Sequence, residues 1–460
     1  MNGIHPPPND SDQDPQPSPA ASATSAVAST SSLKNPLHVE VRLKVRSTAR
    51  LDSIKKYVKD FIEANYCNLE CESDLVGWKG SPFLADHVDS IRIAESSAGL
   101  ETIAIESCNI EIHAYQPTAS DEVEEYSAAD PDGEDADDVM AATVAELPSR
   151  ALDGVWDSLV YADDIKVRLL NYIYTTLLFS DANVDFNIVS WNRVVLLHGP
   201  PGTGKTSLCR ALAQKLAIRL SDRYTHGKLV EINSHSLFSK WFSESGKLVQ
   251  RLFSMVTELV EDEDGFVVIL IDEVESLTAA RSAAAAGTEP SDAVRVVNAL
   301  LTQLDKLKHR KNVLVMTTSN ISESIDTAFI DRADIKQYIG LPPPEAVYWI
   351  LKTCLGELTR VGLVAPTTIL DCKAAKLLHA GIGVNEGDES KTASSSLWKL
   401  ANMCSGISGR TLRKLPVLAH ARHIGLAAAP VPCGVWLDAM HKALDETREE
   451  LAKALGGSSV

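Results

Sequence analysis

The sequence lacks the features of a secreted or membrane-spanning protein. Its eight cysteines are scattered along 460 residues without a C-x-x-C pair, so neither a disulfide framework nor a cysteine-based zinc site is indicated. No apolar run approaches the roughly 20 residues that a membrane span needs. The first residues also lack the charged-then-apolar pattern of a signal peptide. We therefore expect a soluble, intracellular protein with reduced cysteines and no membrane partner.

The chain also lacks an excess of positive charge. It has 62 acidic and 44 basic residues and a formal net charge of −18, which on average repels a polyanion such as DNA. We expect no direct binding to nucleic acid, although this composition leaves room for a local basic patch. Hydrophobic residues make up 45% of the chain, enough for a sizeable core, and the length suits roughly two to four domains.

One stretch carries most of the recognisable chemistry. The apolar run 194–197 predicts a buried strand, and it is followed by Gly199-Pro200-Pro201-Gly202-Thr203-Gly204-Lys205-Thr206, which matches the phosphate-binding pattern G-x-x-x-x-G-K-[ST]. Glycines let several backbone N–H groups turn toward one anion, and the helix that follows adds positive partial charge at its N-terminus. We expect this loop to bind ATP, with Lys205 at the β- and γ-phosphates and the Thr206 hydroxyl on Mg²⁺.

Two later apolar runs also end in polar side chains. Asp272 and Glu273 follow the run 267–271, and Asn320 follows the run 312–316. We expect Asp272 to hold Mg²⁺ and Glu273 to polarise the attacking water. Asn320 on its own is typical of a helix cap, but after this series of motifs we interpret it as the residue that positions the water and senses the γ-phosphate.

Strand and helix patterns alternate through the middle of the chain, with strands expected at 194–197, 228–233, 267–271, 312–316 and 337–339. Such alternation predicts an α/β fold, in which helices cover both faces of a parallel sheet. The expected organisation is a disordered Pro-, Ser- and Ala-rich tail over 1–35, a small α+β domain over 36–116, an acidic linker over 117–150, a large ATPase domain over 151–344 and a helical lid domain over 345–460. The α+β domain, with strands at 39–45, 88–93 and 103–112, contains no catalytic cluster and is interpreted as a recognition module. Residues 381–396 are expected to form an exposed loop.

These motifs, in this order and followed by a helical lid, resemble those of AAA+ ATPases. Three further stretches, Phe238–Lys247, Asp331–Ile339 and Gly406–Pro416, resemble the pachytene checkpoint AAA+ family. The resemblance is strong over about residues 152–455 and looser over the N-terminal domain. It implies a homohexameric ring that uses ATP and Mg²⁺ to convert HORMA-domain proteins from a closed to an open form.

The resemblance also implies a setting and further partners. Family members act at meiotic chromosome axes, in recombination and synapsis, and in the spindle checkpoint, which places them in the nucleus and the cytoplasm. The N-terminal domain would receive either the HORMA-domain protein or a comet-type adaptor.

The resemblance assigns further roles to individual residues. Arg332 would be the arginine finger that reaches a neighbour's ATP, although the broader AAA pattern often has two arginines here, R-x-G-R, and this chain has only Arg332. Arg410 would be the lid arginine called sensor 2. Lys240-Trp241-Phe242 would form the pore loop that grips the substrate, because polar residues flank it; the alternative is an aromatic pair in the core.

Two other functions fit parts of the sequence. One is a nucleic-acid-stimulated, clamp-loader-like ATPase, which the acidic balance and the aromatic pore loop disfavour. The other is a scaffold that binds ATP without turnover, which the complete set of Lys205, Asp272, Glu273 and Asn320 disfavours.

Overall fold

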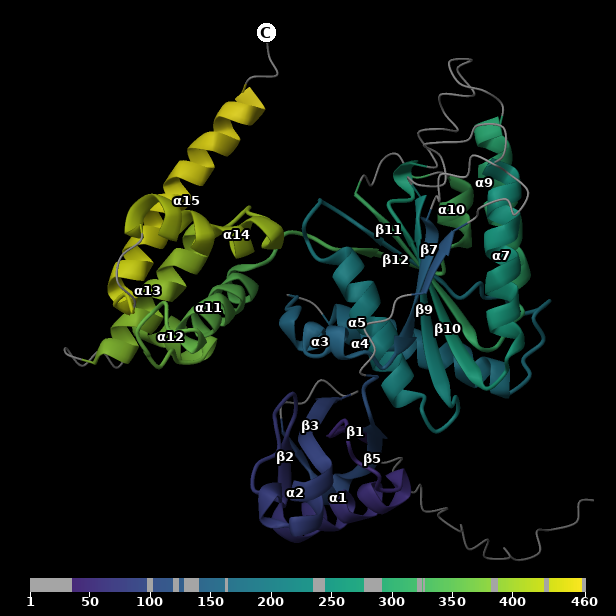
Figure 1. Ribbon diagram of the computed structural model, residues 1–460, viewed down its shortest axis with the longest axis horizontal. Coiled ribbons are helices and arrows are strands. Elements are labelled where there is room, and N and C mark those ends of the chain that lie inside the picture. The colour runs from purple at the N-terminus through teal and green to yellow at the C-terminus, as the bar shows by residue number, and fades with distance from the viewer. Residues whose placement is uncertain are drawn as a thin grey trace, which may run out of the picture.

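The computed structural model shows three folded parts (Figure 1): a small N-terminal domain, a central domain built on a large sheet, and a C-terminal helical domain. It describes residues 35–96, 102–118, 124–127, 140–161, 164–234, 245–276, 292–320, 325, 327–381, 388–425 and 430–456. The tail expected over 1–35 therefore lies, except for its last residue, outside the described residues. None of the eight cysteines, all in the described part, forms a disulfide. Among the described helices, none has the length and apolar character of a membrane span.

The N-terminal domain is a three-stranded sheet, in the order β3-β1-β5, covered on one face by helix α1. Its elements are β1 Asn35–Leu43, α1 Leu51–Asn65, β2 Asn68–Glu70, the 3₁₀ turn η1 Trp78–Gly80, α2 Pro82–His87, β3 Val88–Ser96, β4 Thr102–Ala104, the 3₁₀ turn η2 Ile105–Ser107 and β5 Cys108–Tyr115. Strand β1 alternates as expected: Leu37, Val39 and Val41 are fully buried in the core that α1 covers. The other face of β1 carries His38 and Glu40, because successive side chains of a strand point to opposite faces.

The strand expected over 103–112 is wrong in one respect. The structure divides this run into β4, the turn η2 and β5. The Ser107 hydroxyl donates to the carbonyl oxygen of Ala104 at 2.7 Å and closes the turn. Such a local side-chain bond competes with strand pairing. Because Ile residues lie on either side of the turn, the sequence looks like one continuous strand.

The central domain has a seven-stranded sheet in the order β12-β8-β11-β10-β9-β7-β6. Its elements are β6 Glu124–Ser127, β7 Met140–Leu147, the 3₁₀ turn η3 Arg150–Leu152, α3 Val155–Ser158, α4 Ile165–Asp181, β8 Val194–His198, α5 Lys205–Arg219, β9 His226–Asn233, α7 Ser245–Glu261, β10 Gly265–Asp272, α9 Asp292–Leu307, β11 Val313–Ser319, α10 Thr327–Arg332 and β12 Ile335–Tyr338. The five strands expected from the sequence are parallel to one another. Helices α7, α9 and α10 cover one face, and α4 and α5 cover the other. The α/β fold with both faces covered is thus confirmed.

The linker expected over 117–150 is wrong where the chain forms strands β6 and β7. Strand β7 pairs antiparallel with β9, from Ala142 opposite Ile232 to Leu147 opposite Gly227, and β6 pairs with β7. Ala142 and Val144 are buried in the same core as helices α7 and α9. The large domain therefore begins earlier than the sequence suggested. The alternation of apolar residues in β7 is short and follows an acidic stretch, and for this reason it did not indicate a strand.

The C-terminal domain is a helical bundle. It contains α11 Pro344–Arg360, α12 Cys372–His379, α13 Glu389–Met403, α14 Gly409–Ala419, the π-helical turn η4 His420–Ile424 and α15 Cys433–Gly456. The loop expected over 381–396 is wrong from residue 388 onward. Asp388 caps α13 by accepting from the N–H groups of Ser390 and Lys391, and Ser394 is fully buried. The small polar residues in the first turns of α13 made this segment resemble a loop in the sequence. Residues 382–387 lie outside the described part.

We predict that Val144→Asp destabilises the large domain. A linker would tolerate this change, whereas a buried strand position would receive an unpaired charge and lose its apolar contacts, at a cost of about 3 kcal/mol or more. Urea unfolding of the full chain measures the effect. The control is Glu146→Gln on the same strand at an exposed position, which should stay within about 0.5 kcal/mol. Equal, small effects of both changes would contradict the placement of β7 in the sheet.

Candidate functional site

The phosphate-binding loop joins the end of β8 to the start of α5, and its glycines are required by geometry. Gly199 has φ +143°, and a Cβ there would lie 2.2 Å from the carbonyl oxygen of Ile339. Gly202 has φ +75°, and a Cβ there would lie 2.9 Å from the Ser408 hydroxyl of the C-terminal domain. A side chain is therefore excluded at both positions, and the loop keeps the tight turn that presents its N–H groups.

Lys205 and Thr206 occupy the first turn of α5. The Lys205 ammonium is buried and donates to the carbonyl oxygens of Gly199 at 2.9 Å and Pro200 at 2.8 Å. Burial lowers its pKa. The Thr206 hydroxyl donates to Oδ1 of Asp272 at 3.0 Å. Hydroxyl and carboxylate oxygens are the ligands that Mg²⁺ takes beside a phosphate, so the pair expected from the sequence to hold the metal lies together.

Glu273 follows β10 in a left-handed backbone conformation, φ +57°, which costs energy for a residue with a side chain. Its amide N–H donates to the Thr318 hydroxyl at 3.2 Å, and the Val274 N–H donates to the Thr318 carbonyl at 2.9 Å. These bonds to β11 hold the turn. The Asn320 amide reaches Oε1 of Glu273 at 3.5 Å, so the expected water-polarising and phosphate-sensing residues are neighbours.

Thr318 is a site residue whose role the sequence did not reveal. Its side chain is buried, and its hydroxyl donates to Oδ1 of Asp272 while it accepts from the Glu273 N–H. One hydroxyl therefore positions both acidic residues. The sequence feature that could have indicated this role is the three consecutive polar residues, 317–319, in a strand that is buried throughout. Glu275 also helps to position Asn320, because its Oε1 accepts from the Asn320 backbone N–H at 3.1 Å.

Beside these groups lies a cleft of about 730 Å³ between the large domain and the C-terminal domain. The cleft contains the phosphate loop, Asp272, Glu273, Asn320 and, from α14, Arg410 and Arg413. Apolar side chains that belong to none of the motifs, Leu159 and Ile350 among them, also line the cleft. The volume and the mixture of apolar wall and few polar groups are typical of a small-molecule site.

Of the two arginines expected to be functional, one lines the cleft and the other does not. Arg410 lines the cleft, and its backbone N–H donates to the carbonyl oxygen of Gly202 at 3.2 Å. Arg332, at the end of α10, does not line it; its guanidinium donates to Oδ1 and Oδ2 of Asp305 at 3.0 and 2.8 Å. Its role at a neighbour's nucleotide stays a prediction. The expected pore loop 240–242 lies outside the described residues.

Comparison with known proteins accounts for nearly the whole chain. Residues 195–341 match the model of the ATPase family associated with various cellular activities (AAA), residues 32–120 match the TRIP13 N-terminal domain, and residues 343–448 match the TRIP13-like AAA+ ATPase lid C-terminal domain. The pachytene checkpoint protein 2 homologs of dog and human are 48% and 47% identical to it over 91% of this chain and 94% of theirs. The chain belongs to the pachytene checkpoint protein 2 family.

A solved structure of this family has the same fold. The structure of C. elegans PCH-2 superposes with a TM-score of 0.71 at 32% identity and covers 90% of this chain and 100% of that one. The AAA+ fold, with a C-terminal lid and a separate N-terminal domain, is confirmed. As a member of the pachytene checkpoint protein 2 family, the protein is a nucleotide-binding ATPase. The phosphate loop, Asp272 and Glu273 line its cleft.

We predict that Thr318→Val lowers ATP turnover by about tenfold or more. Valine keeps the shape but removes one bond to the Asp272 carboxylate and one from the Glu273 amide; a hydrogen bond to a charged group contributes about 1.5–3 kcal/mol, and 1.4 kcal/mol corresponds to tenfold in rate. Steady-state ATPase assays measure the effect. Thr318→Ser retains the hydroxyl and should keep turnover within about threefold, since that is under 1 kcal/mol. If serine is as damaging as valine, the hydroxyl is not what positions the two acids.

Proposed function

We propose that this protein is a homohexameric ATPase that remodels HORMA-domain proteins, converting a closed, partner-locked form into an open one. The observation that carries the proposal is the extent of the match: relatives 47–48% identical align over 91% of the chain, and the TRIP13 N-terminal domain model matches residues 32–120. The similarity thus includes the part of the chain that would receive the substrate, and not only the ATPase.

The arrangement of the cleft supports a chemomechanical cycle. Mg²⁺ would be held by Thr206 and Asp272, and Glu273 would polarise the water that attacks the γ-phosphate. Arg410 belongs to the lid and lines the same cleft as Lys205. A γ-phosphate contacted from both domains draws them together, and its loss releases them. The resulting movement would pull the substrate chain through the pore loop at Lys240-Trp241-Phe242.

The proposed setting follows from the family. The protein would act on HORMA-domain proteins of meiotic chromosome axes, and so in recombination and synapsis, and on those of the spindle checkpoint, in the nucleus and the cytoplasm. A comet-type adaptor is a further proposed partner at the N-terminal domain.

A ring is supported by the position of Arg332. Its guanidinium is engaged by Asp305 of α9 and does not line the cleft of its own chain. We propose that it completes the site of the adjacent subunit, where a cation stabilises the charge of the transferring phosphoryl group.

The decisive experiment uses Glu273→Gln. The amide cannot act as a base, but the phosphate loop is unchanged, so this variant should bind ATP and lose turnover by roughly 10²-fold or more. With ATP, it should also retain a HORMA-domain protein in a pull-down, and the wild type should open that protein in an ATP-dependent manner. Lys205→Ala is the control, because it should weaken ATP binding itself. Turnover stimulated by DNA, with no effect on a HORMA-domain protein, would instead favour the clamp-loader-like alternative.

A mixing experiment tests assembly. Arg332→Ala and Lys205→Ala subunits are each expected to be inactive alone. Rings mixed from the two should regain part of the ATPase activity, because some interfaces then pair an intact phosphate loop with an intact Arg332. Mass photometry establishes that mixed rings exist. Complete inactivity of such rings at every ratio would argue against action of Arg332 between subunits.

A further inference from the structure

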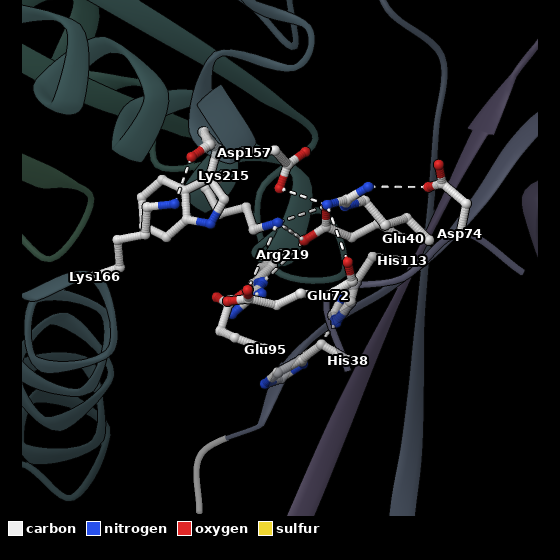
Figure 2. Close-up of polar contacts among 12 residues, drawn as sticks. His38, Glu40, Glu72, Asp74, Glu95, His113, Asp157, Lys166, Lys215 and Arg219 are labelled. Atoms are coloured by element: carbon white, nitrogen blue, oxygen red, sulfur yellow. Dashed lines mark hydrogen bonds and ion pairs between the residues drawn. The ribbon is translucent and has the colours of Figure 1, made fainter. Parts of the chain in front are cut away.

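The N-terminal domain meets the large domain through a buried group of charges. Glu40 of β1 and Glu95 of β3 lie on the face of the N-terminal sheet opposite α1, and Lys215 and Arg219 extend toward them from the last turns of α5. Figure 2 shows the Lys215 ammonium between the two carboxylates. These four residues are called the interdomain network below.

The contacts of the interdomain network are close and reciprocal. Lys215 Nζ lies 2.7 Å from Oε1 and 2.8 Å from Oε2 of Glu40, and 3.9 Å from Oε2 of Glu95. Arg219 donates from Nη2 to Oε1 of Glu95 at 2.7 Å and from Nε to Oε1 of Glu40 at 3.2 Å. Each cation therefore contacts both carboxylates, so the two domains are held by four charges acting together.

Water is largely excluded from the interdomain network. The exposed fractions of the Arg219, Lys215, Glu40 and Glu95 side chains are 2%, 5%, 8% and 11%. Burial alone would raise the pKa of Glu95, but the positive charges of Arg219 and Lys215 outweigh it and hold that pKa at about 2. Glu95 is thus ionised at neutral pH, and the positive charges of Lys215 and Arg219 likewise lower the pKa of Glu40 despite its burial. Removal of one member leaves a buried charge without its partner, which is strongly unfavourable.

Outer ion pairs of the opposite polarity fix the orientation of the two domains. Here the N-terminal domain supplies the cations: Arg42 Nη1 lies 2.9 Å from Oδ2 of Asp153, and Arg92 Nη2 lies 3.2 Å from Oδ1 of Asp157. A rotated arrangement would bring like charges together, so the charge pattern favours one orientation.

Two histidines complete this face without forming a cation site. His38 and His113 lie 3.0 Å apart, and Oε2 of Glu111 lies 3.3 Å from His38 Nδ1, a spacing compatible with metal ligands. Burial and then the positive charge of Arg219 lower the pKa of His38 to about 3 and that of His113 to about 4. The same positive potential opposes a metal ion, so we interpret these rings as a neutral, hydrogen-bonded border of the interdomain network.

Helix α5 connects this interface directly with the nucleotide site. It begins at Lys205, which follows the phosphate loop, and ends at Arg219. It is buried along nearly its whole length, so it cannot bend or turn independently of the sheet. Gln214 on the same helix also holds Ser149, with bonds of 2.8 and 2.9 Å to its backbone. The phosphate loop and the N-terminal domain therefore share one rigid element.

We propose that the interdomain network is a coupling joint: it makes the N-terminal domain a rigid extension of the helix that starts at the phosphate loop, so that nucleotide-driven movement of the large domain carries the N-terminal domain with it. Its four members are positioning residues and do not touch the nucleotide. This inference rests on the proposed function, because it explains how a substrate bound to the N-terminal domain would be kept aligned with a moving ATPase.

The test uses full-length protein with Glu95→Gln, which keeps the shape of the side chain and removes its charge. The matched control is Glu63→Gln: Glu63 lies on α1, on the far face of the same domain, and pairs only weakly with Lys59 at 4.0 Å. A milder second variant, Asp153→Asn with Asp157→Asn, removes the outer pairs and leaves the interdomain network intact. Hydrogen exchange followed by mass spectrometry reports docking through peptides from β3 and from the end of α5. Basal ATPase activity and opening of a HORMA-domain protein are measured on the same samples.

We expect Glu95→Gln to accelerate exchange in both sets of peptides, to keep basal ATPase activity within about twofold, and to lower substrate opening per ATP hydrolysed by about tenfold or more. The double aspartate variant should show the same changes to a smaller degree, and Glu63→Gln should match the wild type. Undisturbed exchange in Glu95→Gln would overturn the inference, and so would increased exchange with normal opening per ATP. A wild type that opens no HORMA-domain protein would count against the proposed function alone. The inference would then be decided by whether ATP changes the exchange of β3 in the wild type and not in Glu95→Gln.

Discussion

The packing of helix α5 inside the large domain is the contact on which the rest of the structure depends. Nearly all of its residues are buried, and they join those of α4 and the sheet in one of the two cores of the domain. Because the helix cannot shift in this core, the loop that precedes it is held with its N–H groups directed at the cleft. The same constraint fixes the basic side chains of its last turns, which face the N-terminal domain.

The chemistry of the cleft depends on contacts between adjacent strands. Asp272 is the last residue of β10 and Glu273 follows it, while Thr318 belongs to β11, which pairs with β10 in parallel register. The carboxyl ends of parallel strands meet at one edge of the sheet, which is where open α/β proteins bind their ligands. The left-handed backbone at Glu273 is held by the bonds to Thr318. The sheet thus maintains a side chain in a position that the local sequence alone would not favour.

The sequence was sufficient for those features that depend on local patterns. The phosphate loop, the five parallel strands and the acidic residues after β10 follow from motif spacing and apolar runs, and the structure brings them together as expected. Features that depend on distant partners could not be predicted in this way. Strand β7 is short and follows an acidic stretch, and only its pairing with β9 makes it part of the sheet. Glu40 has the alternating pattern of a solvent-facing strand residue, and Glu95 lies at an irregularity in the pairing of β3 with β1. Only Lys215 and Arg219, far along the chain, bury the two carboxylates. Thr318 looked like any polar residue at the end of a strand.

The position of β7 also affects the order in which parts of the chain can fold during synthesis. The N-terminal domain has its own core and can fold as soon as it leaves the ribosome, as domains generally do. Strand β7 is made next, but its partner β9 and the helices that cover it come much later in the chain. Until His226–Asn233 has been synthesised, Met140–Leu147 can pair only with β6, and its other edge is unpaired and of the kind that other chains can join. The acidic stretch immediately before it repels like-charged copies, and so protects the nascent chain from aggregation during this interval.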